Sequence, residues 1–372
     1  MTKQKKGYFI TYGMSSTQAN SGVALKIRNQ IEAFNNAGLH CEEITFPYRT
    51  GKLAQVMQRL PFTNVDAIWE YRSEFDTANF LYMRHPLMIT GAVRRVLREV
   101  NKRNPRCKIV MEIPTYPYDD EYKTRKFASF LLLRDRYNRN RMQGIMDYWA
   151  NVDEQDEIFG LQSLKITNGI NVDAVPKRIP TNQDLSTLHL CAVAVFSFWH
   201  GYERLIEGLD LYYRNGGTRN IICHFAGNGP ELPLYKELIA EKHLDNHFVF
   251  HGYVEGEALN EIYNLSTLTV GSLGCYKKDC WLSGDLKSRD ATARGIPSIT
   301  GCKTDIFTPD RFPYYLEFPN DSSPLDFNRI IRFHDEVYQN GQEKVIEEIR
   351  AYAWQTVSMD IAMREVIGYF QS

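Results

Sequence analysis

Several features that identify large classes of protein are missing from the sequence. No apolar run reaches the roughly 18 residues that a membrane-spanning helix needs, and no apolar stretch typical of a secretory signal follows the N-terminus. The seven cysteines are widely spaced without a Cys-x-x-Cys pair, which argues against a disulfide framework or zinc site and favours a reducing, cytoplasmic setting. Complete Gly-x-Gly-x-x-Gly, Gly-x-Ser-x-Gly and His-Glu-x-x-His motifs are absent, which argues against nicotinamide binding, a serine hydrolase and a zinc protease.

Neither charge is in large excess. The 372 residues suffice for two or three domains, and 43% hydrophobic with 24% charged residues is typical of a globular protein. The net charge is −1 and no nucleic-acid-binding motif is present, so nucleic acid is not an expected partner. Residues 1–180 nevertheless hold 27 Lys and Arg against 19 Asp and Glu, and residues 181–372 hold 17 against 26. This asymmetry favours two domains with different partners, although chance variation would give the same counts.

Strand-like and helix-like stretches alternate along the chain, which predicts parallel sheets covered by helices. In the first half we predict strands at residues 8–12, 41–46, 66–70, 80–84, 107–112, 147–152 and 164–167. The clearest helical patterns between them lie at residues 22–36, 87–104 and 121–142. A polar stretch at 171–187 interrupts the alternation and is the expected linker.

After this linker the alternation resumes. Strands are predicted at residues 188–196, 220–226, 248–251, 268–272 and 297–300. Helices are predicted at residues 203–214, 231–242, 257–265 and 285–294, and from about residue 327 onward. Two doubly wound halves facing a cleft are the expected architecture, and ligands of such sheets bind at the carboxyl ends of the strands.

Two stretches of the second half carry groups suited to an anionic ligand. Residues 227–229 (GNG) stand between a predicted strand and a helix, where glycines let the backbone approach a ligand, although many tight turns share this pattern. In the predicted helix 285–294, Asp290 could accept two hydroxyl hydrogen bonds from a ribose, and Lys287 and Arg289 add positive charge. The alternative for this helix is a solvated, charged face.

The second half resembles the nucleotide-binding domain of GT-B glycosyltransferases of the retaining family 4 type. Residues 290–297 (DATARGIP) stand in the frame of the family's Glu-Ala-Met-Ala-x-Gly-x-Pro motif, and residues 286–290 (LKSRD) are similar to the Leu-Lys-x-Arg-Glu of bacterial polysaccharide enzymes. Residues 196–208 (FSFWHGYERLIEG) resemble the family's segment that faces the diphosphate. Residues 251–254 (HGYV) resemble the turn that meets the nucleobase. Residues 272–278 resemble a segment of glycine and basic residues in the bacterial polysaccharide enzymes.

The sequence departs from the family's pattern at three places. Asp290 replaces the final glutamate, and Leu282 stands where the first carboxylate belongs, with Asp285 a partial substitute at another spacing. His200 lies near the place of the phosphate-binding lysine, and Arg204 is on the following helix. These departures motivate an alternative function, that of a non-catalytic sugar-nucleotide-binding or partner subunit on the same fold.

The first half carries similar landmarks. Gly22 opens a helix at the loop that in the family passes the sugar and diphosphate, although an ordinary capped helix would look the same. Residues 80–86 (FLYMRHP), 112–119 (EIPTYPYD) and 168–173 (NGINVD) resemble segments of the family. Glu112 is therefore the expected polar residue beside the sugar or acceptor, and the alternative is a strand-end carboxylate paired with a neighbouring base.

Basic and histidine-rich stretches suggest two further kinds of site. The basic stretches 84–108 and 123–141 could lie on an anionic membrane, at its inner face, as expected for an enzyme acting on a lipid-linked acceptor; the alternative is ordinary helices with solvated charges. His243, His247 and His251 have four-residue spacing, but a strand at 248–251 separates them too far for one ion, so no metal site is predicted.

The resemblance implies an α/β protein of the GT-B fold, with Rossmann-like domains at 1–175 and 188–350 and a C-terminal helix at 351–372 that returns to the first domain. It implies transfer of a sugar from a nucleotide-diphosphate sugar, of UDP or GDP type, to a glycan or glycolipid hydroxyl, with retention, in capsular or exopolysaccharide biosynthesis. No cofactor beyond the donor is implied. The expected catalytic residues are Glu112, His200 and Lys287. The donor is expected to meet Gly22, Trp199, Gly201, Gly227, Asn228, Gly229, Tyr253, Val254, Lys277, Lys278, Leu286 and Asp290.

Overall fold

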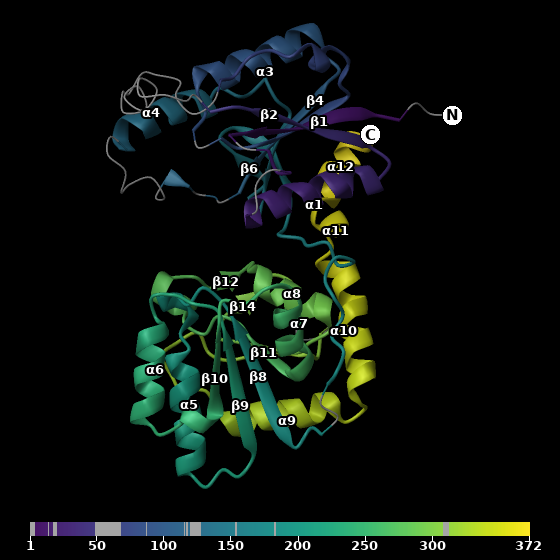
Figure 1. Ribbon diagram of the computed structural model, residues 1–372. Coiled ribbons are helices and arrows are strands. Elements are labelled where there is room, and N and C mark those ends of the chain that lie inside the picture. The colour runs from purple at the N-terminus through teal and green to yellow at the C-terminus, as the bar shows by residue number, and fades with distance from the viewer. Residues whose placement is uncertain are drawn as a thin grey trace. The chain divides into compact units, whose positions relative to one another are not determined.

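The chain forms two compact units in a computed structural model (Figure 1). The structure describes residues 4–13, 15–17, 21–48, 68–86, 88–114, 116, 118–119, 128–152, 155–181, 184–307 and 312–372. One unit consists of Met1–Gly169 with Met359–Ser372, and the other of Ile170–Ser358. From the sequence we predicted domains at 1–175 and 188–350 and a returning helix at 351–372; the contacts within the chain divide it after Gly169 and after Ser358.

The first unit is built on a seven-stranded sheet with the order β2-β1-β3-β4-β5-β7-β6. Its strands are β1 (Lys6–Tyr12), β2 (His40–Phe46), β3 (Phe80–Arg84), β4 (Lys108–Ile113), β5 (Tyr148–Asn151), β6 (Glu157–Ile158) and β7 (Leu161–Lys165). All neighbours pair in parallel except β6, which runs antiparallel to β7 at the edge. The helices are α1 (Gly22–Asn36), α3 (Gly91–Arg103), α4 (Ala128–Arg139), α11 (Met359–Ala362) and α12 (Arg364–Gln371).

Both faces of this sheet are buried, because successive side chains of a strand point to opposite sides. Tyr8 and Ile10 join a core with α3, whereas Phe9 joins a second core with α1, α11 and α12. In the second core the ring of Phe370, near the C-terminus, stacks on Phe80 with centroids 4.4 Å apart. The C-terminal helix α12 therefore completes the first unit.

The second unit is built on a six-stranded parallel sheet with the order β10-β9-β8-β11-β13-β15. Its strands are β8 (Thr187–Val193), β9 (Asn220–Ala226), β10 (Phe248–Gly252), β11 (Leu268–Val270), β13 (Ser298–Thr300) and β15 (Tyr315–Glu317). The strands thus run third, second, first, fourth, fifth, sixth, and the order reverses between β8 and β11. In open parallel sheets this reversal opens a crevice for ligands at the carboxyl ends of the two strands.

In the described residues, the helices of this unit are α5 (Glu203–Arg214), α6 (Leu232–Glu241), α7 (Gly256–Leu265), α8 (Leu286–Arg294), α9 (Phe327–Tyr338) and α10 (Gln342–Thr356), of which α10 packs against α8. Figure 1 shows α5 and α6 on one side and α7 and α8 on the other. Short segments complete the unit, namely η3 (Phe198–His200), η4 (Asp245–His247), η5 (Cys275–Lys278), β12 (Leu282–Ser283) and β14 (Lys303–Thr304). The helix α8 ends at Gly295, whose φ of +82° and close approach to Ile346 of α10 leave no room for a side chain.

The predicted α/β fold with two doubly wound units is confirmed, whereas single elements differ. Of the strand predicted at 66–70, residues 68–70 are described and form no strand; Ile68 is 40% exposed, so its side chain finds no sheet face to cover. The helix predicted at 121–142 is seen as α4, and its first residues lie outside the described part. In the described residues no helix has the length and apolar character to cross a membrane.

Candidate functional site

Two loops meet at the point where the strand order of the second unit reverses. One loop follows β8 and contains η3, and the other follows β11 and contains η5. Gly201 adopts φ +63°, and a Cβ built on it would lie 2.5 Å from the backbone nitrogen of Gly274. The backbone N–H of Leu273 donates to the carbonyl of His200 at 2.8 Å. Glycine at both loops therefore permits the contact that fixes His200 beside the end of β11.

His200 is buried and neutral. Its Nδ1 accepts a hydrogen bond from the backbone N–H of Ser197 at 2.9 Å, which leaves the ring proton on Nε2. Burial and the nearby charges of Lys287 and Lys278 lower the pKa of His200 to about 3. The ring can therefore donate one hydrogen bond from Nε2 but carries no positive charge at neutral pH.

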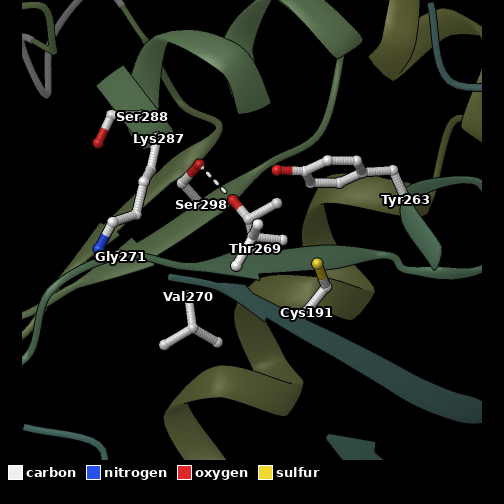
Figure 2. Close-up of a pocket in the computed structure, with 9 residues that line it drawn as sticks. Cys191, Tyr263, Thr269, Val270, Gly271, Lys287, Ser288 and Ser298 are labelled. Carbon is white, nitrogen blue, oxygen red and sulfur yellow. Dashed lines mark hydrogen bonds between the residues drawn. The ribbon is translucent and has the colours of Figure 1, made fainter. Parts of the chain in front are cut away.

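A positive charge near His200 is carried by Lys287, in the first turn of α8. Its side chain reaches toward Gly271 at the end of β11 (Figure 2), and its buried Nζ has no hydrogen-bond partner among the described residues. Burial lowers the pKa of Lys287 to about 8, against the opposing effect of Asp285. The group is therefore a cation at neutral pH, held in the protein without an acceptor, and an anion would satisfy it.

The amine of Lys287 borders a small pocket between the sheet and α8. The pocket is lined by Cys191, Val193, Tyr263, Thr269, Val270, Gly271, Lys287, Ser288 and Ser298 (Figure 2). Thr269 and Ser298 share a hydrogen bond of 2.8 Å between their hydroxyls. Lys287 and Ser288 place the N-terminus of α8 beside the pocket, so the helix dipole adds positive potential there.

Asp285 caps α8 and does not extend toward this pocket as a free carboxylate. It accepts hydrogen bonds from the backbone N–H of Ser288 at 2.8 Å and from the hydroxyl of Ser283 at 2.9 Å. The sequence suggested Asp285 as a partial substitute for the carboxylate missing at Leu282. The structure gives it a capping role, which the Ser288 spacing could have indicated.

The two other predicted lysines have partners in the protein. Lys277 forms an ion pair with Glu203 of α5, and the Lys278 ammonium lies 5.2 Å from the ring centroid of Trp199. The pair between Lys277 and Glu203 joins the loop after β11 to the start of α5. Lys278 forms no ion pair with any residue that the structure describes and is the second charge near His200.

The glycine turn 227–229 packs against the loop after β8. A Cβ on Gly227 would lie 1.8 Å from the carbonyl oxygen of Ala194, and one on Gly229 would lie 2.3 Å from that of Phe196. The carbonyl of Asn228 accepts from the backbone N–H of Phe196 at 2.7 Å. The structure thus explains both glycines by close packing of two loops, and contact with a donor stays a prediction.

Asp290 is held within the second unit. Its Oδ2 accepts from Nε of Arg294 at 2.9 Å, and Arg294 also donates to Asn260 at 2.9 Å and covers the ring of Tyr263. The Asp290 side chain is 28% exposed, so part of the carboxylate still reaches the surface. Leu286, at the start of the same helix, is 48% exposed.

The turn after β10 presents one exposed aromatic side chain. Tyr253 is 72% exposed and donates its hydroxyl to Glu255 at 2.6 Å. Val254 packs against the small core around Cys191 and Ile262. A free aromatic face beside fixed backbone suits a nucleobase, which stays a prediction for this turn.

In the first unit Glu112, at the end of β4, is completely buried and fully paired. Its Oε1 lies 2.9 Å from Nζ of Lys26 and 3.4 Å from a guanidinium nitrogen of Arg84, and its Oε2 accepts from Gln30 and from the Tyr82 hydroxyl. Burial raises the pKa of Glu112, but the charges of Lys26 and Arg84 outweigh it and hold the pKa at about 2. This is the paired carboxylate of the alternative interpretation; a role beside a sugar stays a prediction.

Sequence reasoning missed Lys26, which no motif marks. It lies on α1 and also donates to Asn168 at 3.2 Å. Gly22, the first residue of the same helix, has open space where a Cβ would be, and Ser21 caps the helix through the N–H of Ala24. The capped helix start expected as the alternative at Gly22 is therefore present, and the glycine itself is not needed for packing.

Comparison with known proteins supports a glycosyltransferase fold. Residues 177–273 match the family model described as glycosyl transferases group 1. No curated protein matches the sequence. The chain is 13% identical to a glycosyltransferase from Rickettsia africae, with a TM-score of 0.59 and coverage of 99% of this chain and 98% of the other.

Two further solved structures are similar over nearly their whole length. The sucrose-phosphate synthase from Thermosynechococcus elongatus is 13% identical, with a TM-score of 0.58 and coverage of 99% of each chain. The HepE protein of Anabaena in complex with UDP is 12% identical, with a TM-score of 0.60 and coverage of 98% of this chain and 99% of that chain. These likenesses, with the two doubly wound units described above, show that the chain has the fold of the GT-B glycosyltransferases.

Proposed function

We propose that the protein is a glycosyltransferase that uses a nucleotide-diphosphate sugar as donor. The observation that carries the proposal is the buried ammonium of Lys287, which lacks a hydrogen-bond partner among the described residues and stands where the strand order reverses. The match of residues 177–273 to glycosyl transferases group 1 and the UDP complexes of the Anabaena relative support it.

The chemistry required is stabilisation of the departing nucleoside diphosphate, which gains negative charge as the bond to the sugar breaks. In our proposal Lys287 supplies the charge, with Lys278 adding to it. His200 donates from Nε2, and the N-terminus of α8 directs backbone N–H groups at the same anion. Neutral His200 needs no proton transfer to act, because it donates a hydrogen bond in both ground and transition state.

The rest of the donor would be held by neighbouring elements. Asp290 accepts from the ribose hydroxyls, and the turn with Tyr253 and Val254 meets the base, which is of UDP or GDP type. For the first unit we propose the acceptor glycan as ligand, near the end of β4, where Glu112 orients Lys26 and Arg84. Retention of configuration and a place in capsular or exopolysaccharide synthesis are further parts of this proposal and rest on the resemblance alone.

A donor screen tests the proposal. Thermal shift and donor hydrolysis are measured with UDP-, GDP-, ADP- and dTDP-sugars, without added metal, and stabilisation follows RT ln(1 + [L]/Kd). We expect one nucleotide class to stabilise the protein and to be slowly hydrolysed, and Asp290→Ala to weaken both effects. Glu336→Ala, at an exposed carboxylate of α9, is the control for Asp290→Ala, and Lys344→Met, at an exposed lysine of α10, is the control for variants that remove a positive charge. Failure of every donor to bind contradicts the proposal.

The same screen separates the alternative function. The carboxylate missing at Leu282 favours a subunit that binds a sugar nucleotide without transferring the sugar. Such a protein would be stabilised by one donor and would neither hydrolyse it nor transfer its sugar to any acceptor in a glycan panel.

A further inference from the structure

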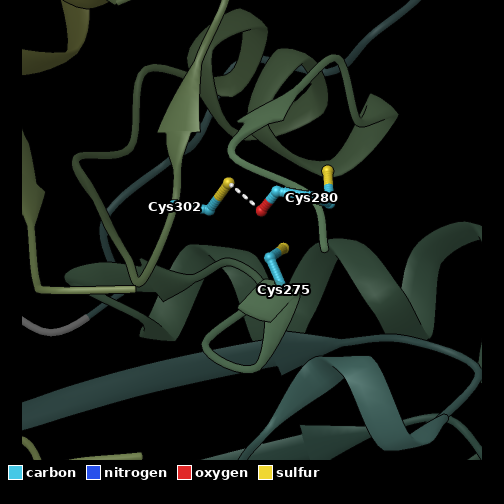
Figure 3. Close-up of side chains that lie close together, drawn as sticks. All are labelled: Cys275, Cys280 and Cys302. Atoms are coloured by element: carbon cyan, nitrogen blue, oxygen red, sulfur yellow. Dashed lines mark hydrogen bonds between the residues drawn. The ribbon is translucent and has the colours of Figure 1, made fainter. Parts of the chain in front are cut away.

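Three cysteines that are distant in the sequence come together beside the loop after β11. Cys275 begins η5, Cys280 follows this segment, and Cys302 follows β13 (Figure 3). Their three sulfur atoms all lie within 4.8 Å of one another. Cys275 and Cys302 are buried, whereas Cys280 is half-buried and gives the cluster access to solvent.

Hydrogen bonds to the backbone fix each of the three cysteines. The N–H of Cys280 donates to the carbonyl of Cys275 at 3.2 Å, so the two belong to one tight turn. The side chain of Asn320 bridges this turn, since it accepts from the N–H of Tyr276 and donates to the carbonyl of Cys280, each at 2.9 Å. The carbonyl of Cys302 accepts from the Tyr315 hydroxyl at 3.0 Å. The cluster is thus held in place before any ligand binds.

We propose that Cys275, Cys280 and Cys302 bind a thiophilic d10 metal ion, for which Zn²⁺ is the probe. In a tetrahedral site with Zn–S bonds of about 2.3 Å the sulfurs stand about 3.8 Å apart. The observed separations, all within 4.8 Å, require each sulfur to move by less than about 1 Å, which side-chain rotation of the half-buried Cys280 can supply. The fourth position remains for water.

The surroundings suit the charge of such a centre. Three thiolates around a dication carry one net negative charge, and Cys275 has two positively charged neighbours, Lys278 and Lys287, against one negatively charged neighbour, Asp285. Thiolate ligands select Zn²⁺ and Cu⁺ over Mg²⁺ and Ca²⁺, which need oxygen ligands. The ion would tie the loop that carries Lys278 to the end of β13, and so belongs to the structure of the site rather than to bond cleavage.

Metal titration of the full-length, TCEP-reduced protein tests the proposal, independently of any donor. We expect one equivalent of Zn²⁺ to bind in competition with a chromogenic chelator, and Co²⁺ to give thiolate charge-transfer absorption. Cys280→Ala and Cys302→Ala should each weaken Zn²⁺ binding about 100-fold. Substitution of residues that only hydrogen-bond to metal ligands already weakens metal binding by up to about 100-fold, so loss of a ligand should do at least as much. Cys223→Ala, at a buried cysteine of the same unit outside the cluster, should bind like wild type.

A second measurement needs no variant. Zn²⁺ should protect Cys275, Cys280 and Cys302 from alkylation by iodoacetamide, as mapped by mass spectrometry, and should raise the unfolding temperature. Equal Zn²⁺ affinity of wild type and Cys280→Ala, or alkylation unchanged by Zn²⁺, overturns the proposal. A third outcome also overturns the proposal. If the reduced protein binds no Zn²⁺, and a disulfide oxidant then joins two of these cysteines in a disulfide, the cluster is a redox pair and not a metal site.

Discussion

The α-carbon of Gly201 packs against the backbone of Gly274, and neither residue leaves room for a Cβ toward the other. This contact between two loops of the second unit holds His200 at the end of β11. Both glycines are buried in the loops that follow β8 and β11, so their close packing fixes the position of these two loops.

Gly201→Ala should therefore disturb the site through a clash and not only through backbone strain. Alanine at φ +63° costs about 1–2 kcal/mol, and a Cβ at 2.5 Å from the Gly274 nitrogen adds about 1–3 kcal/mol more. Gly216→Ala is the matched control, since Gly216 has φ +85° with open space around it. In urea unfolding, Gly201→Ala should lower the free energy of unfolding more than Gly216→Ala does, and it should also weaken donor binding. An equal decrease in the two variants would mean that the contact with Gly274 is unimportant.

Lys287→Met should change the stability of the protein and its affinity for the donor in opposite directions. Replacing a buried cation by an apolar side chain removes its desolvation cost, so we expect the free energy of unfolding to rise by about 1–3 kcal/mol. Donor affinity should fall by about 10- to 100-fold, because a hydrogen bond from a charged donor is lost. Chemical denaturation and thermal shift with donor measure the two effects, with Lys344→Met as control. A destabilised variant that binds donor normally would contradict both parts.

Donor binding should weaken as the pH rises through about 8. The pKa of Lys287 is lowered to about 8 in the free protein, so the ammonium predominates below this pH and is lost above it. If the charged form alone binds the diphosphate, the dissociation constant increases about tenfold between pH 7 and pH 9. Isothermal titration calorimetry between pH 7 and pH 9 measures how the dissociation constant depends on pH. In Lys287→Met the dissociation constant should not change with pH over this range. If it still rises as in the wild type, the pH dependence belongs to another group.

Glu112→Gln should destabilise the first unit strongly. The substitution leaves the charges of Lys26 and Arg84 without their buried partner, which costs about 3–5 kcal/mol. Since the pKa of Glu112 is about 2 and thus below that of the unfolded chain, its contribution to stability is present above pH 4.5 and is lost as the pH falls toward 2. Urea unfolding at several pH values should show this acid dependence in the wild type and not in the variant. Glu99→Gln, at an exposed pair with Arg103, should leave stability unchanged.

The exposed stripe of α4 should bind anionic membranes. Phe130, Leu133 and Tyr137 are 52%, 61% and 57% exposed, and Arg136 and Arg141 lie near them. An apolar stripe bordered by basic residues suits a headgroup layer. Sedimentation with vesicles containing phosphatidylglycerol should be salt-sensitive and should weaken in Phe130→Ser/Leu133→Ser. Leu234→Ser, at an exposed leucine of α6, is the control. Equal sedimentation of the three proteins would show that α4 is an ordinary solvated helix.

The sequence alone determined the parts of the protein that depend on local pattern. Alternating strands and helices predicted the α/β fold, the pattern of residues 285–294 predicted α8, and the order of residues 286–290 drew attention to Lys287 and Asp290. These features are readable because hydrophobic period, capping residues and glycine turns act over a few neighbouring residues.

Pairing between distant residues was decided only by the tertiary structure. Lys26 and Glu112 are 86 positions apart and meet because α1 packs on the end of β4. The glycines of 227–229 proved to pack against the loop after β8, and Cys275, Cys280 and Cys302, whose spacing suggested no metal site, proved to lie together. Such contacts depend on strand order and register, and many sequences with the same local pattern can place these side chains elsewhere.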